Sequence, residues 1–186
     1  MSPLMVNSPN LNQIIDLCLK GDRKAQEQLF HSYSGVMFSI CRRYTSNIQE
    51  AEDILQEGFI KIFTNLTSYE KTGSFEGWMK KIFINTALRT ISKKSSTHEL
   101  NGYEVLPEET IEPSIISRLS EEQLLNLISE LPKGYRAVFN LYAIEGYSHR
   151  EVGEMLGMEE STSRSQLVKA RRMLQDKFIE LQKIAV

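Results

Sequence analysis

Residues 146–174, GYSHREVGEMLGMEESTSRSQLVKARRML, contain the pattern that decides the fold. Ser148 with Glu151 three residues later is a capping box, which marks the start of a helix. The apolar residues that follow at helical spacing are Val152, Met155 and Leu156. Gly157 permits a sharp turn, and a second helix begins near Glu160. The stretch therefore predicts two helices joined by a tight turn.

The second of these helices is predicted to run to about Gln182 and to have two faces. Leu167, Ala170, Leu174 and Phe178 are expected to point inward. Hydroxyl, amide and cationic side chains are expected on the outer side, with arginine at its edge: Ser161, Thr162, Arg164, Ser165, Gln166, Lys169 and Arg172. Such groups hydrogen-bond to base edges and phosphates, so this face predicts contact with the major groove of DNA.

The rest of the chain also predicts helices and no sheet, because period-2 apolar runs are rare. The expected helices are Leu11–Lys20, one capped by Asp22 and ending near Tyr44, Asn47–Leu66, and Phe75–Lys93 capped by Ser74. After residue 119, a capping box at Ser120 and Gln123 starts a helix that Pro132 closes, and another runs to Gly146. The fold class is therefore all-α, with a helix-turn-helix in its C-terminal part.

Charge and composition divide the chain into three parts. Residues 1–98 carry 12 Lys and Arg against 9 Asp and Glu, residues 99–122 carry 1 against 7, and residues 123–186 carry 9 against 8. The acidic, Pro-containing stretch lacks apolar periodicity, which favours a linker. We expect two small helical domains, residues 1–94 and 120–186, joined by a flexible acidic linker at 95–119.

The predicted helix at 47–66 has an unusual outer face. At about 100° per residue, Asp53, Gln56, Glu57 and Ile60 lie opposite the side that faces the core. An isoleucine surrounded by carboxylates gains nothing from folding alone. It is typical of a docking surface with an apolar centre and an acidic rim, although a solvated face with one stray apolar residue stays open.

A basic stripe follows on the next predicted helix. It comprises Lys80, Lys81, Asn85, Arg89 and Lys93, beside Trp78 and Phe75, which are expected to pack in the core. Basic and amide side chains beside aromatic rings suit phosphate contact and base stacking on an opened strand. In the loop before this helix, Tyr69, Lys71 and Thr72 are candidates for holding an unstacked base.

The sequence disfavours several other classes of protein. Cys18 and Cys41 are expected to be buried core residues, and His31, His98 and His149 share no ligand spacing, so neither a metal nor another cofactor is expected. There is no phosphate-binding glycine loop or nucleophile motif, which argues against an enzyme and a small-molecule substrate. The chain has no apolar run of about 18 residues and no signal-like N-terminus, which predicts a cytoplasmic protein without membrane insertion.

Three strings in order make the chain resemble the extracytoplasmic-function (ECF) class of RNA polymerase sigma factors. AEDILQEGFIKIF (51–63) resembles the polymerase-binding segment, SFEGWMKKIFINTALR (74–89) the segment that reads the −10 element, and residues 131–174 the domain that reads the −35 element. Ser161, Ser163 and Gln166 depart from a glycine, a β-branched residue and an arginine that are common in the family. The base preference at −35 is therefore not fixed by the resemblance.

The resemblance implies a role for each candidate residue. Asp53, Gln56, Glu57 and Ile60 would bind core RNA polymerase. The basic stripe and the 67–73 loop would bind the −10 region of promoter DNA, and residues 161–172 the −35 element. The small class also implies regulation by an anti-sigma factor.

The sequence leaves other functions open. The first is a stand-alone helix-turn-helix regulator that binds DNA without polymerase, in which the acidic linker and the carboxylate-rimmed isoleucine would have no role. An enzyme and an adaptor bundle are weaker alternatives, because the former lacks a motif and the latter needs no basic helix faces.

Overall fold

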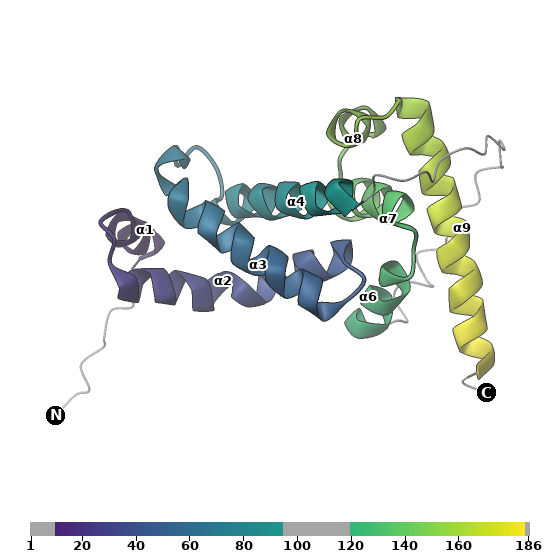
Figure 1. The fold of residues 1–186 in the computed structure, drawn as a ribbon, viewed down its shortest axis with the longest axis horizontal. Coiled ribbons are helices and arrows are strands. Elements are labelled where there is room, and N and C mark those ends of the chain that lie inside the picture. The colour runs from purple at the N-terminus through teal and green to yellow at the C-terminus, as the bar shows by residue number, and fades with distance from the viewer. Residues whose placement is uncertain (1–9, 95–119, 185–186) are drawn as a thin grey trace.

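A computed structural model describes residues 10–94 and 120–184, and within these ranges the chain is helical with no strand (Figure 1). The all-α prediction is confirmed. The acidic stretch predicted as a linker, 95–119, lies outside the described residues. Within the part that is described, no helix has both the length and the apolar character needed to cross a membrane.

The N-terminal part consists of residues 10–94. Its elements are α1 (Leu11–Leu19), α2 (Arg23–Tyr44), α3 (Ile48–Thr64), a 3₁₀ turn η1 (Leu66–Ser68) and α4 (Phe75–Lys94). The predicted caps form: Asp22 Oδ1 accepts from the Ala25 N–H at 2.9 Å, and Ser74 Oγ accepts from the Gly77 N–H at 3.0 Å. The sequence placed the end of α3 two residues too late, because Leu66 is buried but belongs to η1.

Glycine sets the spacing between α3 and α4. A Cβ added at Gly58 would lie 2.1 Å from Cε1 of Phe83, whose side chain is fully buried. Phe83 in turn packs edge-on against Phe59, with ring centroids 5.4 Å apart. Because only a hydrogen fits at Gly58, the two helices approach closely and their outer faces keep a fixed relation.

The C-terminal part consists of residues 120–184. Its elements are α6 (Glu121–Ser129), α7 (Lys133–Phe139), a π turn η2 (Asn140–Ile144), α8 (His149–Leu156) and α9 (Glu160–Ile184). Both predicted capping boxes are present, Ser120 with Gln123 and Ser148 with Glu151. The π turn was not predicted; in it the Glu145 N–H donates to the Asn140 carbonyl at 2.9 Å.

The helix-turn-helix prediction is confirmed in α8 and α9. Gly157 ends α8 in the left-handed conformation with φ 66°, which favours glycine. Gly153 is also required, because a Cβ there would lie 2.6 Å from the Met158 carbonyl oxygen. His149 and Ser163 join the two helices, with His149 Nδ1 2.9 Å from Ser163 Oγ. The turn is therefore held by backbone conformation, close packing and one buried polar contact.

The long helices α2, α3 and α4 lie side by side at one end of the molecule, and α9 stands across the other end (Figure 1). Helices α6 and α7 lie between them and contact α2. The predicted inward residues of α9, Leu167, Ala170, Leu174 and Phe178, are buried, as are Cys18 and Cys41. One continuous apolar core therefore joins both parts of the described chain.

Candidate polymerase and promoter interface

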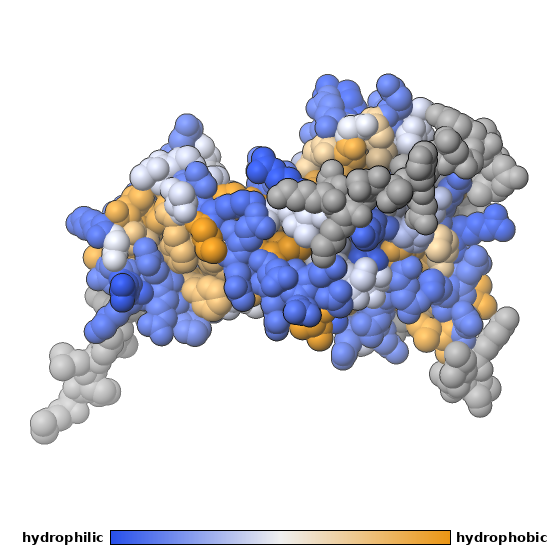
Figure 2. Space-filling view, in the orientation of Figure 1, coloured by the Kyte–Doolittle hydropathy of each residue, from blue (hydrophilic) through white to orange (hydrophobic). Residues whose placement is uncertain are grey.

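The outer face of α3 is exposed, as the helical spacing predicted. Asp53, Gln56 and Glu57 are exposed, and Ile60 is 66% exposed. Figure 2 shows hydrophobic surface over the end of the molecule that carries α1 and the end of α3. The buried residues of α3 lie on the opposite side of the helix; they are Ala51, Ile54, Gly58, Phe59 and Ile62. Leu55 is only partly buried.

Lys61 links this face to α4. Its Nζ lies 2.6 Å from Glu57 Oε1 and donates to Thr86 Oγ1 at 3.1 Å. Lys61 is half-buried, and Thr86 is 1% exposed. The carboxylate of Glu57 is therefore oriented by a lysine anchored to the neighbouring helix. Sequence reasoning missed Lys61; its spacing of four residues from Glu57 was the available signal.

Helix α4 presents a polar stripe to the outside. Lys81, Asn85 and Arg89 are exposed and four residues apart, so they lie on one face, with the half-buried Trp78 beside them. Lys80 is turned away from this stripe, and its Nζ lies 2.8 Å from Glu76 Oε1. The backbone of Lys93 lies in the last turn of α4, but its side chain is outside the described part of the structure.

The loop before α4 is built on an aromatic cluster. The ring of Tyr69 lies 5.0 Å from that of Phe75 and 5.5 Å from that of Trp78, and its hydroxyl donates to the Gly73 carbonyl at 2.7 Å. Phe75 is buried, as expected, whereas Trp78 is only partly so.

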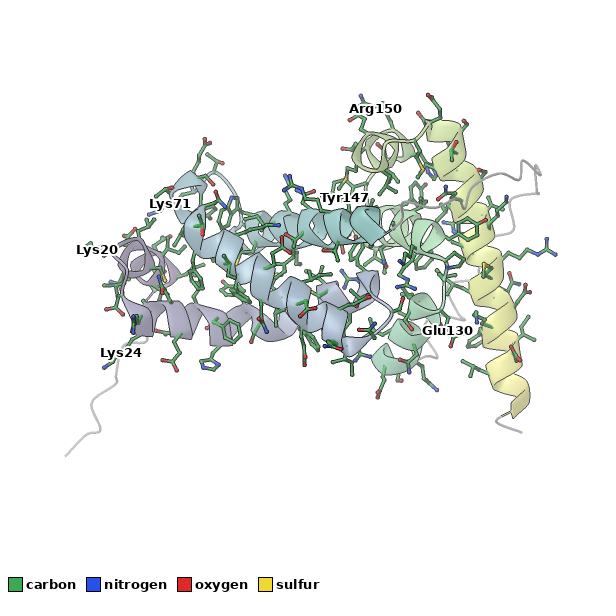
Figure 3. The ribbon with its side chains drawn as sticks, viewed as in Figure 1. Lys20, Lys24, Lys71, Glu130, Tyr147 and Arg150 are labelled. Carbon is green, nitrogen blue, oxygen red and sulfur yellow. The ribbon has the colours of Figure 1, made fainter. Side chains whose placement is uncertain are left out.

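Two loop residues remain at the surface. Lys71 adopts φ 58° and its Nζ lies 3.2 Å from Asp16 Oδ1 on α1 (Figure 3). Thr72 is exposed. The predicted base-holding residues are therefore together, with an aromatic floor and an exposed cationic rim.

On α9, the outward stripe comprises the exposed Ser161, Arg164 and Arg172, with Thr162, Ser165 and Lys169 half-buried along it. The guanidinium of Arg164 pairs with Glu160 one turn earlier, and Ser165 Oγ donates to the Thr162 carbonyl at 3.0 Å. Val168 lies in the middle of the same stripe and is half-buried. The predicted face was defined by hydroxyl, amide and cationic residues and so did not include Val168, yet an apolar side chain there suits a thymine methyl group.

The placement of Gln166 on the outer face was wrong. Gln166 is 2% exposed, and its amide lies against Gly134 of α7, where an added Cβ would be 3.4 Å from Gln166 Oε1. At about 100° per residue, Gln166 is rotated roughly 140° from Ser161, toward the buried Ser163 and Ala170. Two of the three positions that depart from the family pattern, Ser163 and Gln166, are therefore interior.

One carboxylate near this site has a shifted pKa. The Ser148 side chain and backbone N–H hydrogen-bond to Glu151, which lowers the pKa of the Glu151 carboxyl. Figure 3 shows Arg150, on the same helix, pointing away from the rest of the molecule. The N-terminal turn of α8 is thus stabilised by an ionised Glu151.

Comparison with known proteins agrees with this geometry. Residues 29–97 match the family described as Sigma-70 region 2, and residues 121–174 match Sigma-70, region 4. The chain is 29% identical to the ECF RNA polymerase sigma factor SigW of Bacillus subtilis over 178 residues, covering 87% of this chain and 93% of SigW. It is 31% identical to ECF sigma factor SigE of Mycolicibacterium smegmatis over 165 residues, covering 84% of this chain and 63% of SigE.

Among solved structures, the chain is similar to CnrH in complex with the cytosolic domain of CnrY. The TM-score is 0.49 at 18% identity, with 90% of this chain and 96% of that one covered. A second similar structure is the sigma factor RpoE with the anti-sigma factor NepR from Bartonella quintana, with a TM-score of 0.47 at 16% identity, covering 83% and 96%.

The two matched regions and the two similar sigma factors define the class: the chain belongs to the sigma-70 family of RNA polymerase initiation factors, in its ECF class. It is a sigma factor that binds core RNA polymerase and promoter DNA and directs promoter-specific initiation. The alternative of a stand-alone regulator is not favoured. Sigma factors are in general DNA-recognition proteins rather than enzymes.

Proposed function

We propose that the work is divided between the parts: residues 1–94 dock on polymerase and bind the −10 element, and residues 120–186 read the −35 element, with residues 95–119 as the link. The observation that carries this proposal is the exposed outer face of α3. There, Asp53, Gln56 and Glu57 surround an isoleucine that is 66% exposed. A small apolar centre with a charged rim is the composition of a protein interface.

A polymerase pull-down tests the docking face. Replacing both Asp53 and Glu57 by alanine should abolish retention of the protein on core polymerase, because both carboxylates would leave the interface. The fold should be unchanged, since both side chains are exposed. The matched control is Glu27→Ala, an exposed carboxylate on α2. Retention of the double variant at the level of the control would refute the assigned face.

For the −10 element, we assign phosphate and base contacts to Lys81, Asn85 and Arg89 on α4, with contributions from Lys80 and Lys93. The loop residues Tyr69, Lys71 and Thr72 would hold an unstacked base. The support is their common location: the aromatic cluster of Tyr69 and Trp78 lies at the start of the same stripe. Stacking on aromatic rings and cationic contacts together suit a single strand.

For the −35 element, we assign base and phosphate contacts to Ser161, Thr162, Arg164, Ser165, Lys169 and Arg172. These residues occupy the first turns of the second helix of a helix-turn-helix, the usual position of groove-reading residues. Permanganate footprinting of the −10 region and base substitution across the −35 region, both with holoenzyme, separate the two assignments. Variants of the α4 stripe should lose strand opening, whereas variants of α9 should change −35 preference.

We also propose that the protein acts by binding alone, in the cytoplasm where core polymerase works, and that an anti-sigma protein controls it. A regulator of this kind should co-purify with the tagged protein from its native cells and compete with core polymerase for it. Recovery of a bound protein that leaves polymerase binding intact would oppose this part of the proposal.

A further inference from the structure

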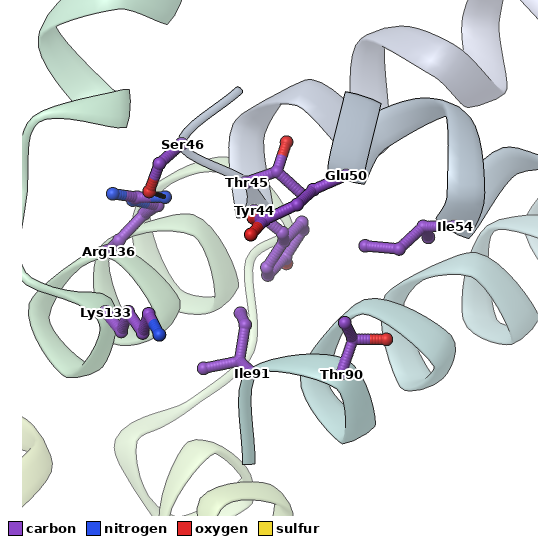
Figure 4. A pocket seen from close by; sticks show the side chains of 9 residues that line it. All are labelled: Tyr44, Thr45, Ser46, Glu50, Ile54, Thr90, Ile91, Lys133 and Arg136. Carbon is purple, nitrogen blue, oxygen red and sulfur yellow. Dashed lines mark hydrogen bonds between the residues drawn. The ribbon is translucent and has the colours of Figure 1, made fainter. Parts of the chain in front are cut away.

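The end of α2 meets the C-terminal part in a polar junction (Figure 4). Arg43 and Tyr44 end α2, Ser46 follows in the turn to α3, and α7 with η2 lies against them. A narrow pocket lies at this junction, lined from one side by Tyr44 and from the other by Arg136. The hydroxyl of Tyr44, which is 1% exposed, has no hydrogen-bond partner there.

Asn140 caps α2 from the other part of the chain. The last carbonyls of a helix lack partners within the helix. The Arg43 carbonyl finds one in Asn140 Nδ2, at 2.6 Å. Asn140 is fully buried and is the first residue of the π turn η2, which directly follows α7. Separating the two parts would remove this bond.

Arg136 provides a second link. The residue is 3% exposed, and its Nη2 donates to the Ser129 and Leu131 carbonyls within its own part. Nη1 donates across the junction to Ser46 Oγ at 3.0 Å. The side chain is therefore fixed by α6 and presents one donor to the N-terminal part.

The third link is an ion pair between Arg43 and Glu145. The side chains are 19% and 13% exposed, so salt screens their attraction less than that of a surface pair. Glu145 directly follows the π turn that begins with Asn140. The π turn and the residue that directly follows it thus supply two of the three contacts.

This packed arrangement conflicts with the reading of two promoter elements at once. On straight B-DNA, positions −10 and −35 lie about 85 Å apart, at roughly 3.4 Å per base pair. A compact chain of this length has a radius of gyration of only about 16 Å. The 25 residues between Lys94 and Ser120 reach about 80 Å when extended, so chain length permits separation.

We propose that Arg43, Asn140, Arg136 and Glu145 form a latch that holds the free protein closed, and that core polymerase must open it. The claim that polymerase must open the protein depends on the proposed −10 and −35 assignments to α4 and α9. The claim that the free protein is closed does not depend on those assignments. Closure lowers the apparent affinity for polymerase in proportion to the fraction of molecules that are open.

Charge reversal of the ion pair tests the latch in the free, full-length protein by small-angle X-ray scattering. Arg43→Glu and Glu145→Arg should each increase the radius of gyration by about a fifth or more, because like charges face each other. The double exchange, R43E/E145R, should restore the wild-type value. Arg42→Glu, the same charge change in the same helical turn, is the control. Single variants with wild-type dimensions would overturn the latch.

The same proteins are then titrated with core polymerase. The single variants should bind roughly fivefold or more tightly than the wild type, and the double exchange should bind like it. Open variants that bind polymerase no better would overturn the inhibitory role. If instead the Asp53 and Glu57 double variant bound polymerase normally, the docking assignment would fail, while the scattering comparison would still decide whether the latch exists.

Discussion

Gly58 has no room for a side chain in the packing between α3 and α4. The ring of Phe83 occupies the space where a Cβ would stand, with its nearest atoms 2.1 to 2.7 Å away. Phe83 is fully buried, so its ring has little room to move. The close approach of α3 and α4 sets where the acidic face of α3 lies relative to the basic stripe of α4.

Gly58→Ala should destabilise the protein by about 1–3 kcal/mol, as overpacking of a tight core does. The measurement is urea unfolding followed by circular dichroism. Gly35→Ala in α2 is the matched control, because an added Cβ there meets nothing within 4 Å. That control should stabilise the helix by roughly 0.5–1 kcal/mol. If both variants were more stable than the wild type, the α3–α4 spacing described above would be wrong.

Glu151 is expected to titrate below its ordinary pKa of 4.5, since hydrogen bonds from Ser148 favour the carboxylate. A lowered acid pKa contributes stability at neutral pH that is lost as the pH falls through the folded-state value. α8 should therefore loosen only in acid, below about pH 4.5. NMR titration of the Glu151 carboxyl measures this. Ser148→Ala should move its pKa upward; an unchanged value would exclude the capping box as the cause.

At the scale of the element, α9 has an interior face and an exposed outer face, to which we assign contact with the −35 element. Gln166 lies against Gly134, while Arg172 is exposed two turns later. A substitution on the interior face should therefore alter packing, and a substitution on the outer face should alter DNA binding.

We expect Arg172→Ala to weaken holoenzyme binding to promoter DNA and to lower the slope of log affinity against log salt by about 1, as loss of one phosphate contact does. Gln166→Met, close in volume, should leave both the slope and the −35 base preference unchanged. Binding titrations at several salt concentrations make the comparison. A change of base preference in the Gln166 variant would return this residue to the reading face.

At the scale of the whole molecule, neither part is strongly basic: residues 1–98 have an excess of three positive charges and residues 123–186 an excess of one. Each part is therefore expected to bind DNA weakly by itself. On polymerase, the second DNA contact would become effectively intramolecular, which would raise avidity without new contacts.

The free protein should accordingly bind promoter DNA about 100-fold or more weakly than the holoenzyme. A mobility-shift titration of one labelled promoter, with protein alone and with core polymerase, measures the ratio. Core polymerase alone is the control for nonspecific retention. Comparable affinity with and without polymerase would favour self-sufficient DNA binding.

The sequence by itself determined the helices, their caps and most faces. Capping boxes at Ser120 and Ser148 and the turn at Gly157 depend on neighbouring residues, and apolar periodicity depends only on the helical repeat. The exposed face of α3 follows from the same repeat. These features depend on residues that are close together in the sequence, so the sequence alone is enough to predict them.

Three features were decided only by the tertiary structure. They are the interior position of Gln166, the hydrogen bond from Lys61 to Thr86, and the ion pair of Arg43 with Glu145. Asn140 and Arg43 are 97 residues apart in the chain, and no periodicity relates them. The π turn that aims Asn140 at α2 has no signal of its own in the sequence. Contacts between distant segments arise from how helices pack in space, and that packing decides which polar side chains are buried.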